Sequence, residues 1–133
     1  MKSTSSLVSI KNDLTPLRKW WVVIYGSYAT GEYTTRSDID VVIITREKNR
    51  EKNKRIWLEI IGQVPSRYDL KVFELLPLEI KAEVIKKNLI IFGDKGEISE
   101  YFYHFRKLWE GMKHRYYENQ FRSIKEKITA SSA

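Results

Sequence analysis

Apolar and polar positions alternate along this chain in blocks that predict three short buried strands separated by helices. The first block, Trp21 to Tyr25, is β-branched and aromatic and stops at Gly26, as a buried strand that ends in a turn would. The second block, Ile39 to Thr45, is also almost entirely apolar, and the run Tyr68 to Leu75 begins with strand-like alternation. The pattern therefore predicts a small sheet.

The third run has one polar and one apolar face. Alternation places Asp69, Lys71 and Phe73 on one side of this predicted strand. The more apolar set is expected on the other side and consists of Leu70, Val72 and Leu76.

Helical spacing accounts for the segments before and after the second strand. An amphipathic opening helix is interrupted or restarted at Thr15-Pro16 and is expected to pack behind the sheet. Its apolar positions are Leu7, Val8, Leu14 and Leu17. A second helix is predicted from Glu47 to Gln63, ended by Gly62 and Pro65, and it links the second and third strands. Its expected inward residues are Ile56, Trp57, Ile60 and Ile61.

The last part of the chain predicts two more helices. One starts at Pro77 and carries Ile80, Val84, Ile85 and Leu89 at spacings of three and four, although Leu89 to Phe92 could instead be a fourth strand. The other is long, from Glu97 to about Ile128, with a wide aromatic stripe. The stripe consists of Ile98, Tyr101, Phe102, Phe105, Leu108, Trp109, Met112 and Tyr116. Core packing is the first interpretation of this stripe, and an interface with a partner or a second copy of the chain is the other.

The predicted fold is therefore α/β, of the α+β kind: a small mixed sheet of three to four strands, flanked by helices, with a long C-terminal helix. We expect residues 1–133 to form a single domain, with a core at about 15–92 and a helical extension at about 97–129. A hydrophobic content of 42% is sufficient for a globular core.

The candidate chemistry lies between the first two strands, in the segment from Gly26 to Asp40. Asp38 and Asp40 are separated by one residue at the start of a strand, so their side chains are expected to project to the same side. Two carboxylates in one small space repel each other, and a divalent cation removes this conflict. Hard oxygen ligands favour Mg²⁺ or Mn²⁺, ions that commonly bridge protein carboxylates to substrate phosphates. Asp69 is the candidate third carboxylate, and Glu74 is its rival on the opposite face.

This arrangement resembles the DNA polymerase beta superfamily of nucleotidyltransferases, and within it the minimal nucleotidyltransferase (MNT) group. The residues that carry the resemblance are Gly26, Ser27, Gly31, Ser37, Asp38, Asp40 and Asp69. One departure is Tyr28, which stands where family members often have an arginine after the Gly-Ser pair. Arg36 is a possible substitute.

The resemblance implies an activity and an assignment of roles. It implies metal-dependent transfer of a nucleoside monophosphate, most simply AMP from ATP, to a hydroxyl group. Asp38, Asp40 and Asp69 would bind the metal ions, while Gly26, Ser27, Gly31 and Ser37 would contact the nucleoside triphosphate. The alternative is a catalytically weak or inactive nucleotide-binding module that neutralises a partner.

The resemblance also suggests a partner. Minimal nucleotidyltransferases are often paired with HEPN-type helical proteins, in some cases as toxin–antitoxin systems in which AMP is added to the partner. A homodimer is a second expectation. The net charge of +7 leaves nucleic acid open as a less favoured partner, because glutamates interleave with the basic residues.

Composition narrows the setting. The chain has no cysteine, which excludes disulfides and thiolate sites and is typical of a cytoplasmic protein. No apolar stretch approaches the roughly 20 residues of a membrane-spanning helix. No export signal is visible at the beginning of the sequence, and His104 and His114 lack the short spacing of zinc ligands.

Overall fold

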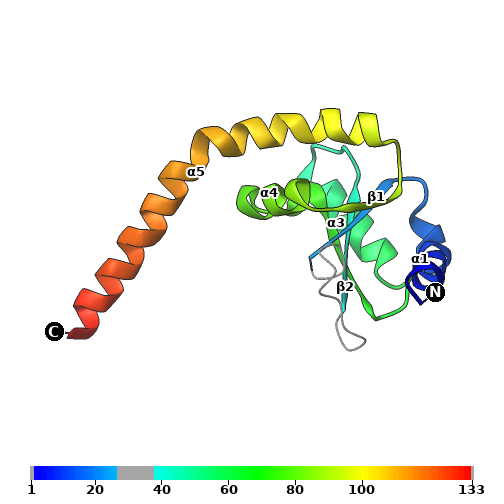
Figure 1. The fold of residues 1–133 in the computed structure, drawn as a ribbon, viewed down its shortest axis with the longest axis horizontal. Helices are drawn as coiled ribbons and strands as arrows, with labels where there is room; N and C mark the ends of the chain where they lie inside the picture. Colours follow the sequence, from blue (N-terminus) through cyan, green and yellow to red (C-terminus); the bar gives the residue numbers. More distant parts are fainter. Residues whose placement is uncertain (1, 27–37, 133) are drawn as a thin grey trace.

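The computed structural model describes residues 2–26 and 38–132 and contains a four-stranded mixed sheet with the strand order β3-β2-β1-β4 (Figure 1). Strands β1 (Trp21–Tyr25), β2 (Ile39–Ile44), β3 (Tyr68–Val72) and β4 (Leu89–Phe92) form this sheet. β1 pairs antiparallel with both β2 and β4, whereas β2 and β3 are parallel. The parallel pair needs a crossover connection, and α3 (Arg50–Ile60) provides it. The predicted fold class and the optional fourth strand are confirmed.

One face of the sheet is covered by the N-terminal part of the chain and by α3. Helix α1 (Lys2–Asp13) and the 3₁₀ turn η1 (Thr15–Leu17), with Leu14 between them, form one side of this cluster. Ile10, Leu14 and Leu17 are its buried residues there, and α3 contributes Ile60. The helix restart at Thr15-Pro16 was therefore predicted correctly. Val8, by contrast, is 56% exposed, and Ile10 takes the buried position instead.

The predicted inward face of α3 was partly wrong. Ile60 is buried, but Ile61 is 40% exposed and Trp57 lies at the surface. Trp57 is positioned by its indole N–H, which donates a hydrogen bond to the Leu70 carbonyl over 2.7 Å. The helix is also shorter than the predicted Glu47 to Gln63. Asn49 caps its start by accepting a hydrogen bond from the Lys52 N–H, and the helix ends at Ile60.

The second face of the sheet is covered by α4 (Leu78–Lys86) and by the first part of α5 (Lys95–Ser132). Its buried residues are Val23, Val42, Ile44, Phe73, Val84, Ile98 and Phe102. Leu76 packs against this cluster, not on the opposite face, because strand alternation stops where Phe73–Leu75 turns into the 3₁₀ helix η2.

Only the beginning of α5 belongs to the core. Ile98 and Phe102 are buried, whereas Leu108 and Met112 are 44% and 49% exposed. Figure 1 shows α5 lying along the domain, then bending and projecting away from it. The core interpretation of the aromatic stripe therefore holds for its first half only. Within the described part of the chain, no helix is both long and apolar enough to cross a membrane.

Candidate functional site

The structure brings Asp40 and Asp69 side by side at one end of the sheet. They are partners in the register of the parallel strands β2 and β3. By strand alternation, both acids lie on the same face of the sheet as Val42 and Phe73, which is the face that α4 and α5 cover. They lie at the beginning of their strands, beyond the apolar cluster on that face. The Asp40 side chain is 30% exposed and that of Asp69 50%, so both carboxylates reach solvent at the edge of a packed core.

Lys71 joins the two carboxylates. Its Nζ donates a hydrogen bond to Asp69 Oδ2 over 2.7 Å and lies 3.6 Å from Asp40 Oδ1. The ammonium is also 5.8 Å from the centre of the Tyr25 ring. Strand alternation predicts Lys71 on the same face as Asp69, but the sequence motif assigns it no role. The signal that could have found it is its spacing, two residues after the third acid on the same strand face.

The electrostatics of this group reflect partial burial. Burial raises the pKa of Asp40, and the nearby Asp69 charge adds to this, while Lys71 opposes it. Burial alone would lower the pKa of Lys71, but its hydrogen bond to Asp69 and the surrounding negative charge outweigh that effect and raise it. Burial also raises the pKa of the Tyr25 hydroxyl. On balance, burial disfavours the charged form of Asp40, and Lys71 offsets part of this effect.

Gly26, which directly follows β1, lies close to the Asp40 carboxylate. Its φ is +80°, a conformation that residues with a side chain rarely adopt. A Cβ at this position would lie 2.6 Å from Asp40 Oδ2. Glycine is thus required both by the turn and by the close approach to the carboxylate.

Of the remaining motif residues, the structure describes Asp38 alone. Asp38 is exposed just before β2, where the Ile39 N–H donates to the Arg67 carbonyl over 3.0 Å. Ser27, Gly31 and Ser37 lie outside the described residues, as do Tyr28 and Arg36.

Glu74, the rival third acid, lies at the opposite end of β2. Its Oε2 accepts hydrogen bonds from the Arg46 N–H over 2.9 Å and from the Tyr101 hydroxyl over 2.7 Å, and its Oε1 accepts one from the Thr45 N–H over 3.2 Å. It thus fixes the end of β2 to α5 and takes no part in the Asp40 group. The prediction of Glu74 as a possible third carboxylate is therefore wrong, because η2 carries it away from Asp69.

The paired acids provide part of what a divalent cation requires. Asp40 and Asp69 are adjacent hard oxygen donors, the ligand type that Mg²⁺ and Mn²⁺ prefer. Across the residues that the structure describes, however, no group of three His, Cys, Asp or Glu side chains is close enough to hold a metal ion. Asp40 and Asp69 therefore supply two suitable oxygen donors and lack a third in the described residues, and the Lys71 ammonium supplies positive charge between them.

Comparison with known proteins points to one family. The family model described as "Polymerase beta, Nucleotidyltransferase" matches residues 20–97, which include β1, β2, β3 and both acids. A protein of Methanocaldococcus jannaschii named "Putative protein adenylyltransferase MJ1547" is 50% identical over 107 residues, which cover 80% of this chain and 83% of that protein. A second protein of this organism, "Putative protein adenylyltransferase MJ0141", is 39% identical over 69 residues, covering 52% of this chain and 66% of that protein.

Solved structures share the fold. A "toxin-antitoxin with AMP-PNP" structure includes a chain that matches with a TM-score of 0.58 at 14% identity, covering 90% of this chain and 98% of that one. Another match, with a TM-score of 0.55 at 12% identity, is a chain from a complex of a "tri-AMPylated Shewanella oneidensis HEPN toxin" with an "MNT antitoxin". It covers 92% of this chain and 98% of the matched chain. Because the identity is only 14% and 12%, these matches show a shared fold and nothing more.

Proposed function

Because this chain belongs to the polymerase beta nucleotidyltransferase family, we propose that it transfers AMP from ATP to a hydroxyl group of a partner protein. The observation that carries the proposal is the pairing of Asp40 with Asp69, with Gly26 closed against Asp40. The 50% identity to a protein named as an adenylyltransferase supports the choice of AMP, and the AMP-PNP complex of a structural relative supports ATP as the donor.

In the proposed reaction, the hydroxyl oxygen of the acceptor forms a bond to the α-phosphorus of ATP. The bond from that phosphorus to the oxygen bridging it to the β-phosphate breaks, and pyrophosphate leaves. Asp69 is the proposed acceptor of the hydroxyl proton, because it is the more exposed of the paired acids.

The remaining motif residues would hold the nucleotide. Asp38 and Asp40, together with Asp69, would bind Mg²⁺ or Mn²⁺, which when bound neutralises phosphate charge and lowers the pKa of the acceptor hydroxyl. The N–H groups of the turn at Gly26, with Ser27, Gly31 and Ser37, would contact the triphosphate. Lys71 would stabilise the charged form of both paired acids.

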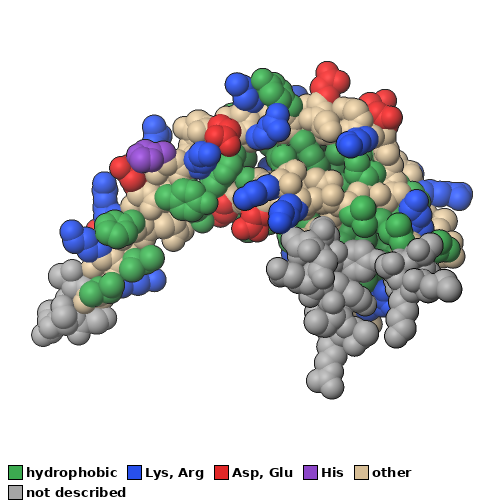
Figure 2. Space-filling model, in the orientation of Figure 1, with side chains coloured by type: hydrophobic (Ala, Val, Ile, Leu, Met, Phe, Trp, Pro, Cys, Tyr) green, Lys and Arg blue, Asp and Glu red, His purple; other side chains and the backbone are tan. Residues whose placement is uncertain are grey.

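The proposed partner is a HEPN-type protein, as in the complexes of the structural relatives. The projecting half of α5 offers a surface for it, with hydrophobic side chains set among lysines and arginines (Figure 2). Its large exposed hydrophobic residues are Tyr117, Phe121, Ile124 and Ile128, which are 55% to 70% exposed. Their spacing of four, three and four residues gives one apolar face, as an interface between helices requires.

The other expected partners receive less support. A homodimer would bring together two chains that each carry a net charge of +7. Nucleic acid is disfavoured because Glu110, Glu118 and Glu126 are interspersed among the basic residues of α5. The cytoplasmic location expected from the cysteine-free composition stays a prediction.

A binding module without catalysis is the second candidate function. The ion pairs of Lys71 with Asp40 and Asp69 favour it, because the ammonium already compensates the two acids. In this case the protein would neutralise its partner through α5 alone.

One experiment separates the two functions. The purified protein and the protein encoded beside it are incubated with ATP labelled in the α-phosphate, with Mg²⁺ or Mn²⁺ or with a chelator. We expect label on the partner with wild type and with Glu51→Gln, whose carboxylate is exposed and remote, and none with Asp40→Asn or with chelator. If Asp40→Asn labels the partner as well as wild type, the assigned site is wrong. If wild type transfers no label although it still binds the partner, the protein is a binding module without catalysis.

A further inference from the structure

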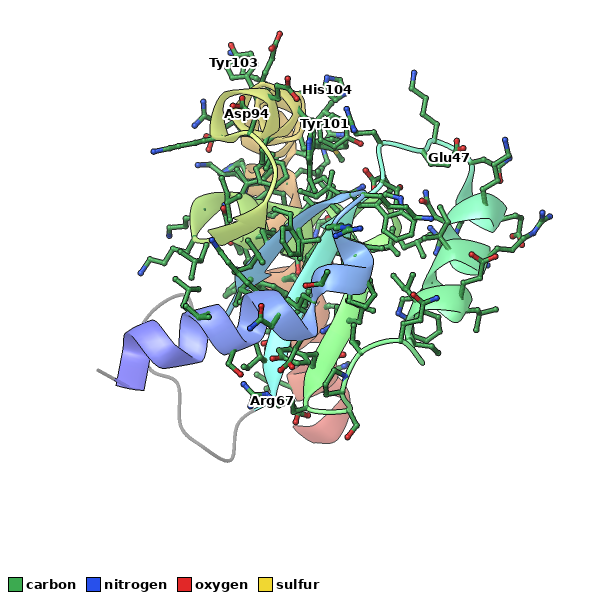
Figure 3. The ribbon with its side chains drawn as sticks, turned by 90° about the vertical axis from the view of Figure 1, so that its right-hand side faces the viewer. Glu47, Arg67, Asp94, Tyr101, Tyr103 and His104 are labelled. Carbon is green, nitrogen blue, oxygen red and sulfur yellow. The ribbon has the colours of Figure 1, made fainter. Side chains whose placement is uncertain are left out.

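A cavity of about 860 Å³ lies at the end of the sheet opposite Asp40. Trp21 starts β1 and forms part of its wall, whereas Tyr25, the register partner of Asp40, ends the same strand. Four residue steps of a β-strand separate these positions by roughly 13 Å. Figure 3 shows Tyr101 and His104 of α5 and Glu47 at one end of the molecule, with Arg67 at the other. This cavity is therefore separate from the proposed catalytic site.

The walls of the cavity are aromatic. Trp21, Tyr101 and Phe105 line it, and the rings of Trp21 and Tyr101 meet edge to face with their centres 5.9 Å apart. The Arg46 guanidinium lies over the Trp21 ring at 3.9 Å. Such surfaces provide flat faces on which another planar ring can stack.

Three cations line the same cavity: Arg46, Lys48 and Lys81. Within the described ranges 2–26 and 38–132, the charged side-chain groups of these three residues form no ion pair within 4.0 Å, although other surface lysines do. Lys81 lies over the Phe105 ring at 5.0 Å, and burial lowers its pKa. An ammonium that is partly desolvated without a salt-bridge partner favours an anion.

Four glutamates also line the cavity: Glu47, Glu74, Glu97 and Glu100. The Glu47 carboxylate is 3.8 Å from the Lys52 ammonium, which compensates its charge. The Glu74 carboxylate is already engaged by Thr45, Arg46 and Tyr101. Glu97 and Glu100 are exposed on α5 at the rim, where carboxylates can accept hydrogen bonds from the hydroxyl or amino groups of a ligand.

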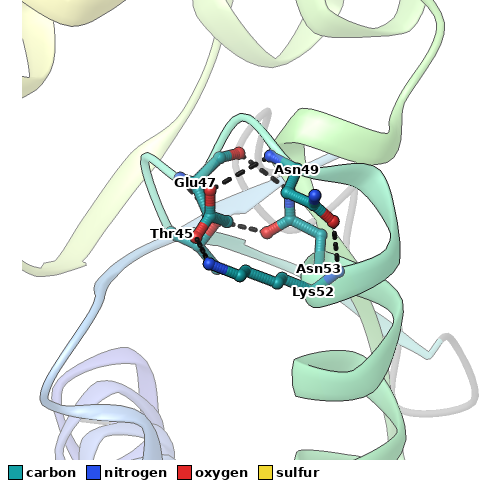
Figure 4. A network of polar contacts seen from close by, with 5 residues as sticks. All are labelled: Thr45, Glu47, Asn49, Lys52 and Asn53. Carbon is teal, nitrogen blue, oxygen red and sulfur yellow. Dashed lines mark hydrogen bonds and ion pairs between the residues drawn. The ribbon is translucent and has the colours of Figure 1, made fainter.

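The loop that carries Arg46 is held in a fixed shape. Arg46 has a φ of +61°, a conformation that costs free energy for a residue with a side chain and persists only where the surroundings enforce it. Figure 4 shows the network that does so, in which Asn53, 1% exposed, donates to the Glu47 carbonyl over 2.8 Å. The Thr45 hydroxyl lies 2.5 Å from Asn53 Oδ1 and accepts a hydrogen bond from the Glu47 N–H. A preformed loop of this kind lowers the entropic cost of binding.

We infer that this cavity binds a small planar aromatic anion of the nucleoside monophosphate class. The base would stack against Trp21 and Tyr101, and the phosphate would lie between Lys48 and Lys81. The volume is sufficient for a ligand of this size. The inference does not depend on the proposed transfer activity.

The test is a titration of the ¹⁵N-labelled full chain with AMP, in the presence of a chelator, followed by NMR chemical shifts. We expect the Trp21 indole and the Arg46 and Tyr101 amides to shift in a saturable manner. Lys81→Met and Lys48→Met should each weaken binding at least tenfold, and so should Arg46→Gly, which keeps a residue suited to positive φ.

Lys54→Met is the matched control, because Lys54 is an exposed lysine of α3 paired with Glu51 and lies outside the cavity. Its affinity for AMP should equal that of wild type. Shifts confined to the neighbourhood of Gly26 and Asp40 would overturn the inference. So would equal affinities of Lys81→Met and Lys54→Met, or the absence of shifts at Trp21 and Arg46.

Discussion

At the scale of single residues, the proposed site depends on a glycine and a lysine as much as on its acids. Gly26 permits the approach of the turn to Asp40, and Lys71 compensates the charge of Asp40 and Asp69. Gly26, Asp40 and Asp69 could be predicted as site residues, because strand parity and motif spacing can be counted along the chain. Lys71 could not, because the contact of one ammonium with two strands is a property of the assembled sheet.

Gly26→Ala should reduce both AMP transfer and stability. The new Cβ would lie 2.6 Å from Asp40 Oδ2 at a φ of +80°, so we expect a cost of about 1 to 3 kcal/mol in the free energy of unfolding. Urea denaturation and the transfer assay measure the two effects. Gly62→Ala is the control, since a Cβ there meets nothing within 4 Å, and its unfolding free energy should change by less than about 0.5 kcal/mol. Equal behaviour of the two variants would refute the proposed role of Gly26.

Lys71→Met should increase the affinity for Mn²⁺. Removal of the ammonium leaves Asp40 and Asp69 uncompensated, and because these groups are partly exposed we expect an effect of about 1 kcal/mol, or roughly fivefold. Electron paramagnetic resonance of free Mn²⁺ measures the binding. Lys54→Met, which removes a charge on α3, should leave it unchanged. Unchanged or weaker binding by Lys71→Met would show that Lys71 does not compete with the cation.

At the scale of secondary structure elements, most of the sheet could be predicted and the helix faces could not. The strands were recognisable because their apolar runs are short and bounded by Gly26, Pro65 and Pro77. The exposure of Trp57 and Ile61 was unexpected, because periodicity shows which residues share a helix face but not how much of that face the sheet covers. Likewise, Glu74 lies away from Asp40 and Asp69 because it belongs to the 3₁₀ helix η2, and strand alternation does not predict such a turn.

Glu74→Gln should destabilise the end of β2 without affecting transfer. Glutamine keeps only one acceptor oxygen, so one of the donors that Glu74 now satisfies loses its partner. Because the donors of Thr45 and Tyr101 are only partly buried, we expect a cost of about 1 kcal/mol. Thermal unfolding measures the loss. The exposed control Glu59→Gln should be neutral. If Glu74→Gln abolished transfer in a folded protein, the exclusion of Glu74 from the site would be wrong.

At the scale of the whole molecule, the candidate catalytic group and the proposed partner surface on α5 lie in different parts of the structure. The candidate catalytic group lies at one end of the sheet, and the second half of α5 projects away from the domain (Figure 1). The long helix could be predicted from its spacing, but its departure from the core depends on how far the small sheet extends beneath it.

Phe121→Ser/Ile124→Ser should abolish partner binding without affecting the fold. Both side chains are largely exposed, at 70% and 55%, so the isolated protein should keep its unfolding free energy within about 0.5 kcal/mol. Isothermal titration calorimetry with the neighbouring-gene protein measures binding. Asn119→Ala/Ser123→Ala changes the opposite side of the same helix and should bind normally. Retained binding by the first variant would exclude this face as the interface.

The central claim is nucleotidyl transfer by the group at the start of β2 and β3. Its most direct test compares ATP labelled in the α-phosphate with ATP labelled in the γ-phosphate, using wild type and Asp40→Asn/Asp69→Asn with the partner protein. We predict label on the partner from α-labelled ATP only, and only with wild type. Transfer of the γ-label, or α-label transfer by the double variant, would contradict the account.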